Sequence, residues 1–278
     1  MLSALLIVFR EIIEAGLIAG IVLAATKGVP HRSRFVALGI LGGVLGACLV
    51  AAFAGELASL FEGSGQELFN AAILLIAVGM LVWHNVWMAS HGRQMARELK
   101  AAGHDVITGK RTLTALTIVV GVAVLREGSE VVLFLYGIIA QGGTSNSALA
   151  LGGVLGLLAG AAMSALMYFG LLTIPAHRLF SVTSGLITLL AAGMAAQAAL
   201  FLQNGGYLNV LTASLWNTAW LLPEDGMTGR LLHTLVGYSD APDGAQIIAY
   251  LVIVAMMLVL MKTVGKPAPR PAPIPAGE

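Results

Sequence analysis

Charged residues are scarce in this chain of 278 residues: they make up 10% of it, under half the share usual in soluble domains. Apolar residues make up 58%. A soluble protein of this composition would expose apolar patches that aggregate, whereas a membrane protein presents them to lipid. The scarcity of charge excludes an ordinary soluble domain and predicts several membrane-spanning segments.

Cysteine and clusters of basic residues are also nearly absent. Cys48 is the only cysteine, so no internal disulfide forms. The net charge is +1, and no run of basic residues indicates a nucleic-acid partner. Residues 1–9 contain no Lys or Arg, and Arg10 and Glu11 interrupt the apolar stretch that a signal peptide needs. We therefore expect the first helix to be retained.

Seven apolar runs are long enough to cross a bilayer, which predicts an all-α polytopic membrane protein with a single transmembrane domain over 1–263. The runs lie at about 3–26, 36–60, 68–90, 113–140, 148–174, 179–203 and 245–263. In the connection 204–244, Leu208, Trp216 and Trp220 indicate a helix in the membrane interface or a short surface-packed helix. The tail 264–278 is rich in Pro and Ala and is expected to be disordered.

The distribution of basic residues predicts the orientation. Twelve of the 15 Lys and Arg residues fall in the connections 1–2, 3–4 and 5–6 and in the tail, and only Arg230 lies in the opposite set. By the positive-inside rule the N-terminus is outside and the tail is cytoplasmic, in the inner (plasma) membrane.

An internal repeat relates the two halves of the chain. Phe9-Arg10-Glu11-x-x-Glu14 returns as Leu125-Arg126-Glu127-x-x-Glu130, at an offset of 116 residues. Ala37–Gly39 and Ala77–Met80 return at offsets of 113 and 114. Because the first and fourth helices enter from opposite sides, we expect an inverted repeat of 3+3 helices, about 3–90 and 113–203, with the seventh helix outside the symmetry.

The two Arg-Glu-x-x-Glu motifs place six ionisable groups inside the membrane. Each costs roughly 2.5–3.5 kcal/mol at a helix centre, so some function or pairing must retain them. Each Arg can neutralise one Glu, which leaves one carboxylate per motif and a formal net charge of −2 if the motifs converge. A bound cation or protons would balance it.

Carboxylates suit hard or borderline ions, so ferric or ferrous iron, manganese, magnesium and calcium all fit, and soft copper(I) does not. The structural alternative is a pair of buried salt bridges that fix helix register. The functional alternatives are a proton relay, a proton-coupled carrier of another divalent metal or a small cation, and an intramembrane enzyme that uses carboxylates or a metal. Against the enzyme alternative, the sequence has no obvious nucleophile or His beside the motifs.

Paired motifs in the first and fourth of seven helices resemble the oxidase-dependent iron permease family, which includes the fungal high-affinity and bacterial three-component iron permeases. Trp216-Asn217-Thr218-x-Trp220 through Gly237-Tyr238 and Pro242 resembles the bacterial members, and the likeness covers about residues 1–263.

The resemblance implies an iron uptake permease, not an enzyme, with no permanently bound cofactor and with a separate periplasmic ferroxidase or iron-delivery protein. It implies that four glutamates coordinate iron and that two arginines accompany them: Glu11, Glu14, Glu127 and Glu130, with Arg10 and Arg126. The family usually has Gly after the first Glu of each motif; Gly128 fits, but Ile12 does not. We expect the larger Ile12 to restrict the approach of a neighbouring helix.

Other polar residues are weaker candidates. Acids on the outer side are candidates for recruiting cations at the outer mouth, or form a solvated acidic loop: Glu56, Glu62, Glu67, Asp240 and Asp243. His84 and His91, toward the cytoplasmic end of the third helix, are candidates for ion release or interface anchors beside Trp83 and Trp87. Gln197 is a candidate donor to a motif carboxylate or a helix-to-helix link.

Overall fold

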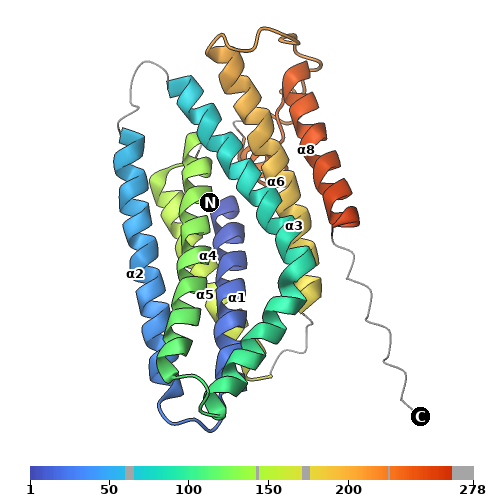
Figure 1. The fold of residues 1–278 in the computed structure, drawn as a ribbon. Coiled ribbons are helices and arrows are strands. Elements are labelled where there is room, and N and C mark those ends of the chain that lie inside the picture. Colours follow the sequence, from blue (N-terminus) through green and yellow to red (C-terminus); the bar gives the residue numbers. More distant parts are fainter. Residues whose placement is uncertain (60–65, 142–143, 171–175, 225, 265–278) are drawn as a thin grey trace, which may run out of the picture.

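The computed structural model describes residues 1–59, 66–141, 144–170, 176–224 and 226–264. In these ranges the chain forms eight α-helices, arranged as an elongated bundle (Figure 1). They are α1 (Leu2–Ala25), α2 (Arg32–Ser59), α3 (Gln66–Ile107), α4 (Leu113–Gln141), α5 (Asn146–Tyr168), α6 (Ala176–Asn204), α7 (Met227–Val236) and α8 (Gly244–Thr263). The two motif helices, α1 and α4, lie in the middle, between α2 and the group of α3, α6 and α8.

Five helices are long and apolar enough to cross a membrane: α2, α3, α5, α6 and α8. The helices α1 and α4 are as long but carry three charged motif residues each. The outer helices expose many large apolar side chains, among them Leu49, Phe53 and Leu158, which suits contact with lipid. The chain is therefore an all-α polytopic membrane protein. The expected tail beyond Val264 lies outside the described residues.

The helix α3 is longer than its apolar run. The sequence predicts a span ending at residue 90 and a polar connection after it, but the helix continues to Ile107. Residues 91–107 contain no proline, and Leu99 and Val106 are buried against Val22 and Leu116. The end of an apolar run marks where lipid contact ends, not where a helix ends.

The helix expected in the outer connection around Leu208–Trp220 is absent, so that prediction is wrong. Residues 205–224 are irregular, and the helix of this connection is α7, further along the chain. The Asn217 side chain accepts from the Ala219 N–H at 2.9 Å, and the Thr218 N–H donates to the Asp240 carbonyl at 2.7 Å. Such bonds compete with helical hydrogen bonds.

Glycines allow two pairs of helices to approach closely: α2 packs along α4, and α5 packs along α1. A Cβ on Gly43 of α2 would lie 2.7 Å from the carbonyl oxygen of Gly121. A Cβ on Gly156 of α5 would lie 2.6 Å from the carbonyl oxygen of Leu5. The two glycines are 113 residues apart and the two carbonyls 116, which are offsets of the sequence repeat.

The expected restriction at Ile12 is not found, because a glycine lies opposite. A Cβ on Gly160 of α5 would lie 2.8 Å from the Ile12 Cβ. At the corresponding position of the other pair, a Cβ on Gly128 of α4 would lie 2.6 Å from the Cβ of Ala47 on α2. Each crossing thus pairs its larger residue with a glycine on the opposite helix.

Two apolar cores fill the bundle at different heights. One includes Ile7 of α1 and Phe134 of α4. The other includes Ile18 of α1 and Val124 of α4. The motif residues fall between these positions on both helices, so the charged groups lie between two apolar layers.

We predict that Gly156→Ala destabilises the protein by about 1–3 kcal/mol, because the added methyl group meets the α1 backbone. The matched control is Gly153→Ala on the same helix, where an added Cβ has no atom within 4 Å. It should be neutral or stabilising, because alanine is the better helix former. Thermal unfolding in detergent, followed by circular dichroism, measures the difference; equal melting temperatures would contradict the close approach.

Candidate metal centre

The structure brings both sequence motifs together in the interior of the bundle. On α1, Arg10, Glu11 and Glu14 are at most 2% exposed. On α4, Glu127 is 3% and Glu130 7% exposed. Four carboxylates from two helices therefore share one enclosed region, where unbalanced charge is costly.

The arginines pair with the glutamates unequally. Arg10 donates from Nη1 to Glu11 Oε1 at 2.9 Å and lies 3.1 Å through Nη2 from Glu14 Oε1. Arg126 donates from Nε to Glu130 Oε1 at 3.1 Å. Glu127 Oε2 is buried and has no hydrogen-bond partner among the described residues. The sequence predicts one paired Glu per motif; Arg10 in fact contacts both acids of its motif.

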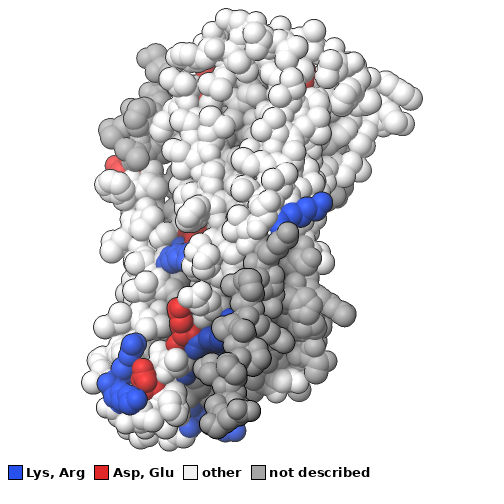
Figure 2. Space-filling view, turned by 45° about the vertical axis from the view of Figure 1, so that its right-hand side comes forward, with Lys and Arg blue, Asp and Glu red and all other residues white. Residues whose placement is uncertain are grey.

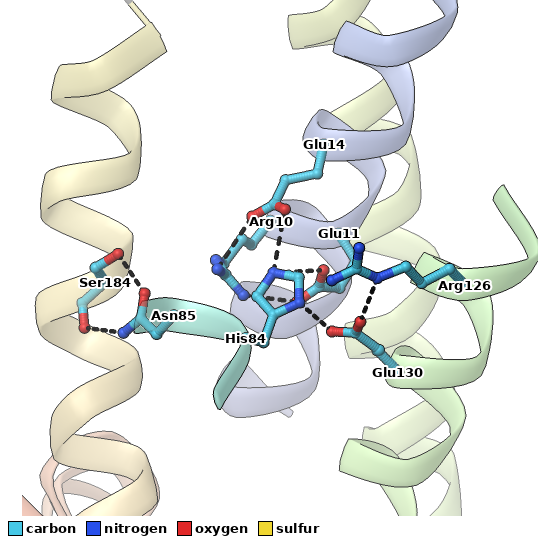
Figure 3. Close-up of polar contacts among 8 residues, drawn as sticks. All are labelled: Arg10, Glu11, Glu14, His84, Asn85, Arg126, Glu130 and Ser184. Carbon is cyan, nitrogen blue, oxygen red and sulfur yellow. Dashed lines mark hydrogen bonds and ion pairs between the residues drawn. The ribbon is translucent and has the colours of Figure 1, made fainter. Parts of the chain in front are cut away.

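His84 of α3 lies between the two motifs (Figure 3). Its Nε2 is 3.1 Å from Glu14 Oε2 and 4.0 Å from Glu11 Oε2, and its Nδ1 contacts Glu130 Oε2. The residue is 1% exposed, so the interpretation as an interface anchor near the helix end is wrong. Because α3 runs on to Ile107, position 84 lies near the middle of the helix.

The arrangement has the donor atoms of a metal site. One ligand atom each from Glu11, His84, Glu127 and Glu130 lies within 4.8 Å of the others. Glu14, the fourth motif glutamate, lies outside this group and contacts the His84 ring. Mixed carboxylate and imidazole donors suit borderline divalent transition metals.

Comparison with known proteins supports this chemistry. Residues 1–265 match the model of the iron permease FTR1 family. The chain belongs to this family. It is similar to the ferrous iron permease EfeU of Escherichia coli O6:K15:H31 (strain 536 / UPEC), with 29% identity over 258 residues, 91% of this chain and 92% of the relative. It is also similar to EfeU of Yersinia pestis, with 28% identity over 259 residues, 92% of this chain and 91% of the relative. No solved structure matches.

The family assignment makes the chain an iron permease and a multi-pass membrane protein, as the motifs predict. It is a transporter and not the intramembrane enzyme considered as an alternative. Iron is accordingly its substrate.

Two further contacts of α3 lie beside the motifs, and neither was predicted from the sequence. Asn85 is 2% exposed; it accepts from Ser184 Oγ at 2.6 Å and donates to the Ser184 carbonyl at 3.3 Å, which joins α3 to α6. Arg126 Cζ lies 4.5 Å from the centroid of the Trp87 ring. The polar pair His84-Asn85 within an apolar run is the signal that could have identified this face of α3.

Of the acids expected on the outer side, those that the structure describes do not gather at the site. Asp243 caps α8 in a capping box with Gln246, and Asp240 accepts from the Glu224 N–H at 3.1 Å. Glu56 is exposed and Glu67 partly buried. Glu62 lies outside the described residues. Recruitment of cations by these acids stays a prediction, and the two aspartates have structural partners already.

The remaining candidates of the permease make no contact with the motif carboxylates in the part of the chain that the structure describes. His91 is exposed and stacks on Trp87, with ring centroids 5.2 Å apart. Gln197 lines a separate cavity of about 220 Å³ between α6, α7 and α8. No bond joins Gln197 to a motif carboxylate within the described part of the chain, so the predicted donation is wrong.

We predict that Arg10→Gln costs the permease more stability than Arg126→Gln. Arg10 is buried and holds two carboxylates, so its loss should cost about 3–5 kcal/mol, the range for breaking a buried ion pair. The Arg126 side chain is 35% exposed and holds one, so its loss should cost less. Thermal unfolding of both variants in detergent provides the measurement; the reverse order would show that the pairing does not stabilise the fold.

Proposed function

We propose that this permease carries ferrous iron across the inner membrane through a site formed by Glu11, Glu14, Glu127 and Glu130. The observation that carries the proposal is the burial of four carboxylates in one region, where only two arginines pair with them. With a neutral His84 the formal charge is −2, which one divalent ion balances. The relatives named ferrous iron permease support the same oxidation state.

The topology that fits this function has seven transmembrane helices, α1–α6 and α8, with the N-terminus outside and the C-terminus in the cytoplasm. On the face drawn in Figure 2, most basic side chains gather at one end, where the connections α1–α2 and α3–α4 lie. That distribution agrees with a cytoplasmic location of these connections.

The two halves, α1–α3 and α4–α6, act in this proposal as inverted repeats around the site. The support is the matched close approach of α2 to α4 and of α5 to α1 at the offsets of the sequence repeat. In inverted-repeat transporters, the substrate lies between the halves and is exposed to each side in turn by their relative motion.

The proposed transport cycle uses the layers around the site. The carboxylates replace the water shell of the ion, while the arginines keep them ionised and oriented. The two apolar cores separate the site from both surfaces. A cavity of about 590 Å³ begins beside Gly16 and Leu17, just past Glu14, and extends to Lys100 and His104. We assign this cavity as the exit to the cytoplasm. It connects to the site when the apolar core around Ile18 and Val124 opens.

A partner completes the proposal. The family resemblance implies a separate periplasmic protein that oxidises or delivers iron, and for transport of Fe²⁺ the partner that fits is one that delivers the ion without oxidising it. In this proposal the negative charge of the exposed Glu56 attracts the cation at the outer mouth.

We predict that Glu127→Gln reduces iron uptake at least tenfold in proteoliposomes loaded with purified protein. The change removes the carboxylate that has no arginine and keeps its size. The control is Glu98→Gln, an exposed glutamate on the far part of α3 that accepts from Gln94. Glu14→Ala and Glu130→Ala should also abolish uptake.

Uptake is compared with anaerobic Fe²⁺, with Fe³⁺ and with Mn²⁺. Transport of Fe²⁺ by wild type and by the Glu98 variant, but not by the Glu127 variant, agrees with the proposal. Wild-type rates in the Glu127 variant, or a preference for Fe³⁺ or Mn²⁺, would refute it.

A further inference from the structure

We propose that His84 is itself a ligand of the transported iron, and that its nitrogen selects iron against Mg²⁺ and Ca²⁺. The inference rests on the proposed function, because it assigns a further ligand to the same site. It goes beyond the glutamate motifs, since His84 belongs to a third helix.

The arginines leave one side of each paired carboxylate open toward His84. Arg10 holds the Oε1 atoms of Glu11 and Glu14, and Arg126 holds Oε1 of Glu130. The Oε2 atoms of the same three glutamates are those closest to the His84 ring. The ring therefore lies where unpaired oxygens of both motifs converge (Figure 3).

The two ring nitrogens have different surroundings, which indicates their roles. Nε2 donates to Glu14 Oε2 at 3.1 Å, and Glu14 is the motif glutamate that does not belong to the group of converging donors. Nδ1 faces Glu130, which does belong to it. We assign Nδ1 as the iron ligand and Glu14 as the carboxylate that orients the ring. Metal-bound histidines usually donate their second N–H in this way.

A purely structural role explains this position less well. The helix α3 is already joined to α6 by Asn85 and Ser184, and a link between helices needs one hydrogen-bond partner. His84 instead approaches carboxylates from both motif helices, and it lies wholly inside the bundle. Nδ1 is buried and has no hydrogen-bond partner among the described residues, and such an atom costs free energy unless it binds an ion or another ligand.

An imidazole nitrogen changes which ions the site prefers. Mg²⁺ and Ca²⁺ favour oxygen ligands, and Mg²⁺ gives up its water reluctantly. Imidazole suits iron and its neighbours among the transition metals. Carboxylates alone would accept the hard ions, so the histidine supplies the discrimination that the motifs lack.

The histidine occurs in one half only. At the offset of 114 residues that relates α3 to α6, His84 corresponds to Ala198. A single ring between two motifs produces one mixed site for one ion, not two equivalent half-sites. The two halves therefore contribute different chemistry to the same ion.

The test measures anaerobic binding of ⁵⁵Fe²⁺ to detergent-purified protein, with Mg²⁺ as competitor. His84→Gln keeps a polar side chain but replaces the ring, and it should lower the Mg²⁺ concentration that halves iron binding about tenfold or more. His91→Gln is the control, two turns away on the same helix and exposed. An unchanged Mg²⁺ concentration in the His84 variant would overturn the proposal.

A second measurement needs no variant and covers the case in which His84→Gln does not fold. X-ray absorption of the wild-type protein loaded with Fe²⁺ should show scattering from one imidazole ring; a shell of oxygen alone would overturn the assignment. Glu127→Gln separates the two proposals. If the Glu127 variant binds and transports iron as well as the wild type, the proposed site itself is refuted. If the Glu127 variant loses both activities while the His84 variant is unchanged, only the role of His84 is refuted.

Discussion

The fold of this permease is organised around a charge imbalance in its interior. Four carboxylates and Arg10 are buried between apolar layers, where water compensates charge poorly, while Arg126 pairs with them from a partly exposed position. Residues of α1, α3 and α4 partly compensate this charge. Arg10 contacts two acids, Arg126 is held against an indole ring, and α3 contributes a histidine that contacts both motifs. The negative charge that remains uncompensated can attract a cation, which is the property that an iron permease needs.

The sequence predicted most helices of the bundle, and the location of the motif residues inside it, because both depend on local patterns; their binding of metal stays a prediction. Apolar runs mark spans, and charged residues inside them are too costly to be incidental. His84 could not be placed in the same way. Hydropathy put it near the end of a span, and only the continuation of α3 to Ile107 shows that it lies mid-helix. The pairing of Arg10 with both acids depends on side-chain conformation, and the irregular chain around Asn217 depends on hydrogen bonds to distant residues. Neither leaves a periodic signal.

The position of the carboxylates depends on residues that carry no charge. The helices α2 and α5 lie close against the motif helices because glycines at the crossings leave room for backbone. The helices come similarly close at two crossings, one at Ile12 and Gly160 and the other at Gly128 and Ala47. The larger residue lies on the motif helix α1 in the first crossing and on α2 in the second. A larger residue on one helix thus requires a smaller residue opposite, if the motif helix and its neighbour are to keep their distance.

The length of α3 connects the site mechanically to the far end of the bundle. From His84 to Ile107 a helix extends about 35 Å, and a tilt of about 5° at the histidine moves the other end by about 3 Å. That end packs against α1, where Gly103 lies close to Ala25, and it lines the cavity through Lys100 and His104. In the proposed transport cycle, a small displacement of the ring around an arriving ion would therefore move the residues that line this cavity by a larger distance. Occupancy of the proposed site and the width of the proposed exit would then be coupled through one helix.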